Sequence, residues 1–339
     1  MSIPEALRDY AIQLGFPESE TLGRIFAILY EGENAVKVVA ALPGTAAEVA
    51  QKTGLPEKHA ADVAAQLLMQ GRIVVDFKRP NVFRRFPAMI ELRDSSVLDP
   101  NAPQELFELW ERLVLKESTP LVEGLKKRDV TAMVRVIPIE RTVQAQNTVL
   151  DVDSARKIFS EASLITAVPC VCRTVARKNG RGQNCPAPET AVCMQTNLFA
   201  MGVLTRKLGE KLSKDEALKR IGEAEDAGLV HMVRNNVQKD MFMCNCCACC
   251  CTGLYFLQQL NFPGSIAPSR FRVKLDPNAC SGCGICEERC QFHAITMNDA
   301  ASINLNQCYG CGNCVITCPE EALALEEIRP REFIRVKAK

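Results

Sequence analysis

Cysteine is the residue that most limits what this chain can fold into. It occurs 18 times in 339 residues, and eight of these thiols stand in two copies of the spacing C-x2-C-x2-C-x3-C, at residues 280–290 and 308–318. Six more fall within the eight positions CNCCACCC, residues 244–251. The first residues, MSIPEALRDY, lack the order of a secretory signal, so we expect a cytoplasmic protein with reduced thiols. In that setting the spacing favours metal binding over disulfides.

The two repeated runs resemble those of bacterial two-cluster ferredoxins over about residues 270–328. In that family each run gives three thiolates to one [4Fe–4S] cluster and its fourth thiolate to the other cluster. Gln291 departs from the pattern, because the family usually has proline there. Zinc is the alternative for C-x2-C pairs. The resemblance implies one cluster held by Cys280, Cys283, Cys286 and Cys318, and a second held by Cys308, Cys311, Cys314 and Cys290.

The other ten cysteines lie in the central region, and their spacing matches no ferredoxin turn. The elements CVCR, CPAPE and CNCC resemble those of ferredoxin-fused iron–sulfur proteins of anaerobic bacteria and archaea, a resemblance that implies metal binding and assigns no substrate. We predict one or two further Fe–S clusters here, with zinc, a reactive thiol pair or buried apolar packing as alternatives for individual thiols. Neighbours such as Cys246 and Cys247 should serve different metals or faces. The predicted metal ligands are Cys170, Cys172, Cys185, Cys193, Cys244, Cys246, Cys247, Cys249, Cys250 and Cys251.

The N-terminal segment, residues 18–87, has no cysteine and resembles a winged-helix domain: helix, short helix, helix and hairpin. Thr45 and Glu48 form a capping-box pattern at the start of the short helix. The hairpin, 72–85, carries five basic residues against one acidic residue, whereas the helices between residues 45 and 71 carry two lysines against three acids. DNA recognition normally needs both elements, so we expect protein docking here and disfavour DNA.

The chain is therefore predicted to be an α+β multidomain protein. Its expected parts are a winged-helix-like domain (1–90), a helical connector (91–165), a cysteine-rich α+β metal-binding domain (166–265) and a ferredoxin-like 2[4Fe–4S] domain (266–339). Lys and Arg number 41 and Asp and Glu number 40, so no overall field attracts the chain to a polyanion. No apolar run reaches the roughly 20 residues that span a bilayer, so we expect no membrane insertion.

The leading hypothesis is an iron–sulfur electron-transfer protein that relays low-potential electrons to or from a partner redox protein or enzyme complex in anaerobic metabolism. A second is an oxidoreductase with its active site at the central cysteines, and a third is a redox-sensing DNA-binding regulator. Whether a substrate is turned over, and the oligomeric state, stay open at this point. The chain shows no phosphate loop, HExxH or radical S-adenosylmethionine motif.

Overall fold

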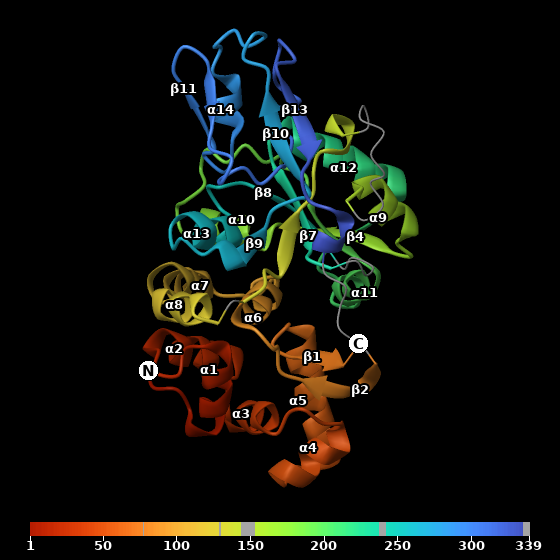
Figure 1. The fold of residues 1–339 in the computed structure, drawn as a ribbon. Coiled ribbons are helices and arrows are strands. Elements are labelled where there is room, and N and C mark those ends of the chain that lie inside the picture. The colour runs from red at the N-terminus through yellow and green to blue at the C-terminus, as the bar shows by residue number, and fades with distance from the viewer. Residues whose placement is uncertain (77, 129, 144–152, 237–241, 335–339) are drawn as a thin grey trace. The chain divides into compact units, whose positions relative to one another are not determined.

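The computed structural model describes residues 1–76, 78–128, 130–143, 153–236 and 242–334 (Figure 1). The chain divides into two compact units, each described here by itself. No helix among the described residues is long and apolar enough to cross a membrane. The N-terminal unit comprises Met1–Gly124, Val171–Arg181 and Thr205–Leu208, and the C-terminal unit comprises Leu125–Cys170, Gly182–Leu204 and Gly209–Lys339.

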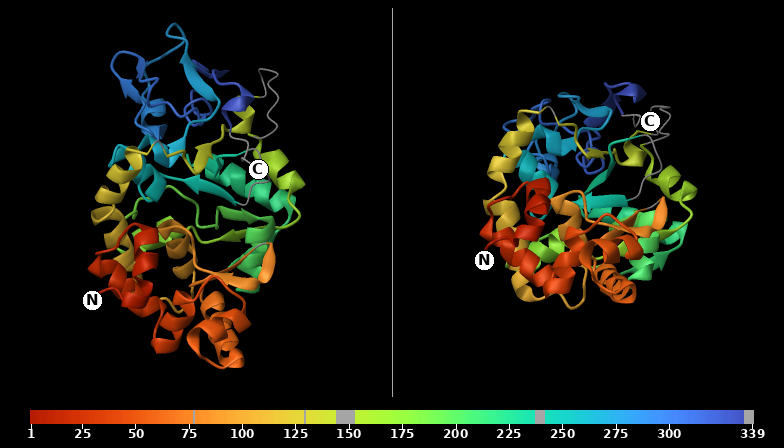
Figure 2. Two further views of the ribbon diagram at one scale, coloured as in Figure 1. Left: turned by 60° about the horizontal axis from the view of Figure 1, so that its bottom comes forward. Right: turned by 90° about the horizontal axis from the view of Figure 1, so that it is seen from below.

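The N-terminal unit is mainly helical, as Figures 1 and 2 show for residues 1–124 in red to yellow. A hairpin pairs β1 (Val74–Asp76) with β2 (Arg79–Arg84). The helices are α1 (Arg8–Leu14), α2 (Glu20–Leu29), α3 (Glu33–Ala40), α4 (Ala46–Thr53), α5 (Glu57–Met69), α6 (Met89–Ser96), α7 (Gln104–Lys116), α8 (Thr119–Lys126) and α10 (Val171–Lys178).

Local sequence explains where α4 begins. The Thr45 hydroxyl accepts from the Glu48 N–H, and the Glu48 carboxylate accepts from the Thr45 N–H at 2.7 Å, which completes the predicted capping box of α4. Helix, short helix, helix and hairpin follow in the order expected from the sequence. The winged-helix assignment itself, like the predicted four-domain division, stays a prediction.

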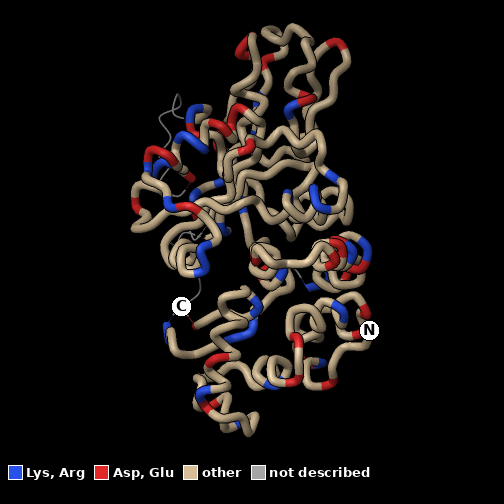
Figure 3. Tube along the Cα trace, turned by 180° about the vertical axis from the view of Figure 1, so that it is seen from behind, with Lys and Arg blue, Asp and Glu red and all other residues tan. Residues whose placement is uncertain are grey.

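Charge on the hairpin is partly paired within the unit. Asp76 contacts both Arg79 and Arg84, and Arg85 contacts Asp9 at 2.9 Å. Figure 3 shows acidic and basic residues interspersed along the described chain. This pairing reduces the positive charge that the hairpin presents to a phosphate backbone.

The C-terminal unit is built on a seven-stranded sheet with the order β6-β4-β5-β8-β7-β3-β9. Neighbouring strands are antiparallel except β3 and β9, which are parallel. The strands are β3 (Val134–Val136), β4 (Ile165–Val168), β5 (Cys193–Thr196), β6 (Glu210–Leu212), β7 (Val230–Arg234), β8 (Phe242–Cys246) and β9 (Ile266–Ala267).

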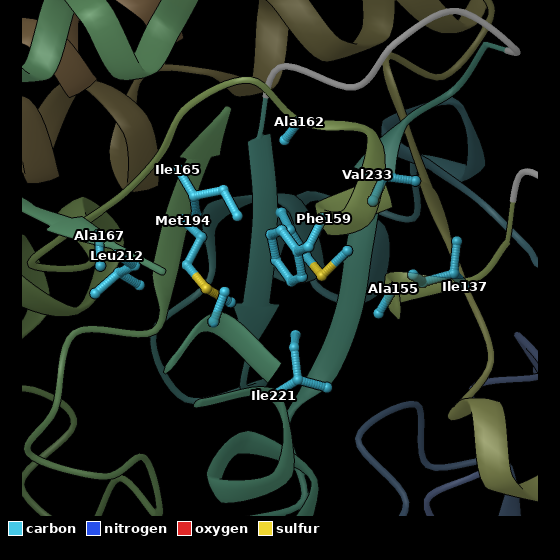
Figure 4. Packing of buried hydrophobic residues seen from close by; sticks show 12 residues of the cluster. Ile137, Ala155, Phe159, Ala162, Ile165, Ala167, Met194, Leu212, Ile221 and Val233 are labelled. Atoms are coloured by element: carbon cyan, nitrogen blue, oxygen red, sulfur yellow. The ribbon is translucent and has the colours of Figure 1, made fainter. Parts of the chain in front are cut away.

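Helices α9 (Ala155–Glu161) and α12 (Lys214–Asp226) pack against this sheet. Phe159 of α9 and Ile221 of α12 meet Met194 of β5 in one apolar cluster (Figure 4). The predicted capping box of Ser213 and Glu216 begins α12. Helices α11 (Asn197–Thr205) and α13 (Thr252–Gln258) complete this part.

The last part of the chain forms two short antiparallel pairs. Strand β10 (Phe271–Leu275) pairs with β13 (Leu323–Glu327), and β11 (Ile295–Met297) pairs with β12 (Ala301–Ile303). The helix α14 (Ile285–Arg289) lies within the first cysteine run and carries Cys286. These elements place the two cysteine runs within one small α+β segment.

A buried ion network joins the sheet to the strand pair β10 and β13. Asp153 is fully buried; its carboxylate accepts from Arg135 Nε of β3 at 3.3 Å and from Arg270 Nε at 2.6 Å. Arg270 Nη1 also donates to Glu327 of β13 at 2.5 Å. Both arginines are almost fully buried, so Asp153 neutralises charge that water does not reach.

Candidate metal centres

One predicted cluster quartet lines a single cavity. The side chains of Cys280, Cys283, Cys286 and Cys318 surround it, together with apolar residues such as Leu275. An apolar cavity ringed by four thiols suits a cluster whose irons bind cysteine and whose faces contact hydrocarbon. The residues present therefore fit a [4Fe–4S] cluster.

The second predicted quartet, Cys290, Cys308, Cys311 and Cys314, is more deeply enclosed. Burial, together with charge on Cys290 and Cys308, raises the pKa of Cys311 to about 12. Burial followed by charge on Cys311 raises the pKa of Cys314. Four crowded thiols of this kind become thiolates together only when bound cations compensate their charge.

Backbone groups are directed at two sulfurs of this second quartet. The Ala294 N–H donates to Cys290 Sγ at 3.3 Å, and the Val273 N–H donates to Cys308 Sγ at 3.5 Å. Hydrogen bonds to the thiolates help to set the potential of an Fe–S cluster.

Gly310, within the second cysteine run, makes a close backbone approach. It has φ +65°, and a Cβ there would lie 2.0 Å from the Phe271 carbonyl oxygen. Only glycine combines this conformation with this spacing.

Four central thiols converge to form what we call the Cys185 group: Cys185, Cys247, Cys249 and Cys250. Their sulfur atoms all lie within 4.8 Å of one another. The sulfurs of Cys185 and Cys247 are 3.4 Å apart, and those of Cys249 and Cys250 are 3.6 Å apart. A single tetrahedral zinc with bonds of about 2.3 Å holds its sulfurs about 3.8 Å apart, so this group could hold one metal ion.

The Cys185 group is partly open to solvent. Cys249 is exposed, whereas Cys247 and Cys250 are buried. Burial, followed by the hydrogen bond to Cys247, raises the pKa of Cys249 to about 12. The Cys249 thiol is thus protonated until a cation enters and displaces the proton.

Four other central thiols adjoin one another and form what we call the Cys244 group: Cys193, Cys244, Cys246 and Cys251. The register of β5 and β8 places Cys193 opposite Cys244, and Cys244, Cys246 and Cys251 lie in one apolar cluster. Interactions with Cys193, then Cys246, lower the pKa of Cys244, and interactions with Cys244, then Cys251, raise the pKa of Cys246. Cys246 and its neighbour in sequence Cys247 therefore lie in different groups.

The last two predicted ligands, Cys170 and Cys172, belong to neither of these two groups. Cys172 lies in α10 of the N-terminal unit, where buried Arg93 donates to its sulfur at 3.2 Å. Cys170 directly precedes that helix and is half-buried. A metal-binding role for these two cysteines stays a prediction.

Two polar residues near the central thiols have structural partners. Asn245 stands between Cys244 and Cys246 in the sequence, and its side chain is buried. Its amide oxygen contacts His231 Nδ1 at 2.5 Å, and its amide nitrogen donates to the Val192 carbonyl at 2.6 Å. Gln291 accepts from the Ala248 N–H, inside the CNCCACCC stretch, at 2.8 Å. Sequence reasoning missed the role of Gln291, although its departure from the usual proline was a signal.

Comparison with known proteins agrees with this geometry at the C-terminus. A family model described as a 4Fe-4S dicluster domain matches residues 279–323. The chain carries a 4Fe-4S dicluster domain near its C-terminus. No curated protein and no solved structure matches the chain. The dicluster domain implies two [4Fe–4S] clusters and suggests a role in electron transfer.

Proposed function

We propose that this protein is an iron–sulfur electron carrier that relays low-potential electrons between its dicluster domain and its central cysteine region, to or from a partner oxidoreductase. One observation carries the proposal. A single apolar cluster contains thiols of both regions: Cys244, Cys246 and Cys251 from the centre, and Cys290, Cys308 and Cys311 from the dicluster domain.

Such a shared apolar cluster suits electron transfer for two reasons. It brings the thiols of the two regions together without an intervening water layer, and it buries them, which tunes the potentials of attached metals. Phe292 and Tyr309 stack within this cluster, with ring centroids 4.5 Å apart. The side chains of this apolar cluster are therefore in direct contact where the two regions meet.

Gln291 adds a polar tie between the same regions. Its side chain accepts from the Ala248 N–H, and its carbonyl accepts from Gln258 of α13 at 2.6 Å. A proline, as in the usual ferredoxin run, has no side-chain acceptor for Ala248. The substitution that departs from the ferredoxin pattern thus connects the dicluster run to the central cysteines.

Anaerobic titration with dithionite, following electron uptake per chain, tests the relay. Two dicluster clusters accept about two electrons, one each, so a relay that includes the central region predicts more than two. Uptake that stops at two, with metal bound in the central region, would show that the centre is redox-inert and would overturn the proposal. Cys311→Ala serves as the control, because it should lower the uptake of the dicluster domain.

A second candidate function is an oxidoreductase active site at the Cys185 group. The exposure of Cys249 favours it, because a substrate could reach a metal there by displacing that ligand. Cobalt-loaded protein tests this candidate. A small thiol should change the cobalt absorption spectrum if a ligand is replaceable, and a closed four-thiolate site leaves the spectrum unchanged.

A further inference from the structure

We propose that the Cys244 group is a second central metal site and that it takes a [4Fe–4S] cluster. The inference deepens the proposed function and rests on it, since this cluster would be the first relay centre beyond the dicluster domain. The proposal also divides the central thiols between two sites. The Cys244 group would bind an Fe–S cluster, and the Cys185 group would bind a single metal ion.

Strand register brings the first three thiols of this site together. In the antiparallel pair of β5 and β8, Met194 lies opposite Met243 and Gln195 lies opposite Phe242. The same register places Cys193 opposite Cys244. Cys244 and Cys246 are two residues apart in β8 and therefore share a face of the sheet.

Asn245 secures that face. Its buried amide is held on the other side of β8 by His231 of β7 and the Val192 carbonyl. Because successive side chains in a strand alternate, fixing Asn245 also fixes the direction of the cysteines on either side of it.

The fourth thiol enters from a turn that follows β8. The Cys251 N–H donates to the Cys247 carbonyl at 3.1 Å, and this turn returns the chain so that Cys251 contacts Cys246. The site thus draws on β5, β8 and the turn before α13. All its members except Cys193 belong to the apolar cluster shared with the dicluster domain.

Surroundings distinguish the two central groups. The sulfurs of the Cys185 group lie within 4.8 Å of one another, and one of its thiols, Cys249, is exposed, as suits a single ion. Three thiols of the Cys244 group, by contrast, lie in the apolar cluster that also contains dicluster thiols. Four cysteine ligands in an apolar, enclosed setting suit an Fe–S cluster, so the Cys244 group fits the cluster class.

The position of the site accounts for its part in the relay. Cys290 and Cys308 pack against the apolar cluster that holds Cys246 and Cys251. Transfer of one electron between these sites forms and breaks no bond: the dicluster site is oxidised as the Cys244 site is reduced, and a low-potential reductant of the partner supplies the electron.

Matched alanine variants of the full chain, prepared anaerobically, test the site by iron and inorganic sulfide content. Cys244→Ala should lose about four irons and about four sulfides relative to the unaltered protein, while the dicluster iron remains. Cys249→Ala should lose at most one metal ion and no sulfide. Unchanged sulfide in Cys244→Ala would overturn the inference.

A second variant guards against misfolding. Cys251→Ala lies outside the strands and should lose the same sulfide as Cys244→Ala, with the spectroscopic signal of the dicluster clusters retained. Retention of all sulfide in Cys251→Ala would likewise overturn the site.

The two proposals fail in different ways. If sulfide is lost as expected but electron uptake of the unaltered protein stops at two, the site stands and the relay fails. If uptake exceeds two and neither variant loses sulfide, the relay stands and the Cys244 site fails.

Discussion

Asp153 offers a direct test of how the central sheet is held to the dicluster strands. Its carboxylate, fully buried, contacts both Arg135 and Arg270, at 3.3 Å and 2.6 Å. Asp153→Asn keeps the shape but removes the charge, so two buried guanidinium groups lose their shared counter-ion. Removing one partner of a buried ion pair costs about 3–5 kcal/mol, and we expect a loss in that range.

The assay is anaerobic urea unfolding, followed by far-UV circular dichroism and by bleaching of the cluster absorbance. Glu327→Gln is the matched control, because Glu327 also contacts Arg270 but its side chain is 35% exposed. A pair with such an exposed partner contributes about 1 kcal/mol or less. If the free energy of unfolding of Asp153→Asn lies within about 0.5 kcal/mol of that of the unaltered protein, the buried network does not stabilise this unit and the reasoning is refuted.

Four further predictions concern local features. Gly310→Ala should strain the second cysteine run by about 1–3 kcal/mol and lower its iron content, whereas Gly222→Ala, where a Cβ meets nothing within 4 Å, should leave iron unchanged; equal iron in both would contradict the steric argument. Ser213→Ala should destabilise α12 by about 1 kcal/mol in thermal unfolding, and no change would argue against the cap. Hydrogen bonds from Ser213 lower the pKa of Glu216, so its stabilisation is present above the usual glutamate pKa and is lost as the pH falls through the lowered value; an acid titration of helicity checks this, and a flat profile would refute it. Because Cys249 is exposed, a strong chelator should remove the metal of the Cys185 group before dicluster iron, as followed by metal release; the reverse order would contradict the assignment.

Features that depend on short-range sequence were predictable. The repeated cysteine runs indicated the dicluster domain because the spacing itself positions three thiolates on one turn. The capping boxes at Thr45 and Ser213 were predictable for the same reason, since a cap involves residues only three apart.

The division of the central thiols was not predictable, because it depends on strand register. Cys193 meets Cys244 only because β5 and β8 pair, and these strands are about fifty residues apart in sequence. Alternation along a strand did predict that Cys246 and Cys247 would differ in direction, but not which partners each would find.

Long-range polar contacts could not be predicted from the sequence. Some residues that make them gave no signal, and others departed from a family pattern without indicating their contact. Asp153 is one carboxylate among many in the sequence, and only the fold shows its two buried arginines. Gln291 stood out against the ferredoxin pattern, yet its bond to the Ala248 N–H requires the tertiary structure.

The most direct test of the account is the inorganic sulfide content of the intact, anaerobically purified protein. Sulfide counts clusters alone, because a single iron or zinc in the Cys185 group brings none with it. Two dicluster clusters and one cluster in the Cys244 group predict about twelve sulfides per chain. About eight sulfides would confine the clusters to the dicluster domain and contradict the cluster assigned to the Cys244 group.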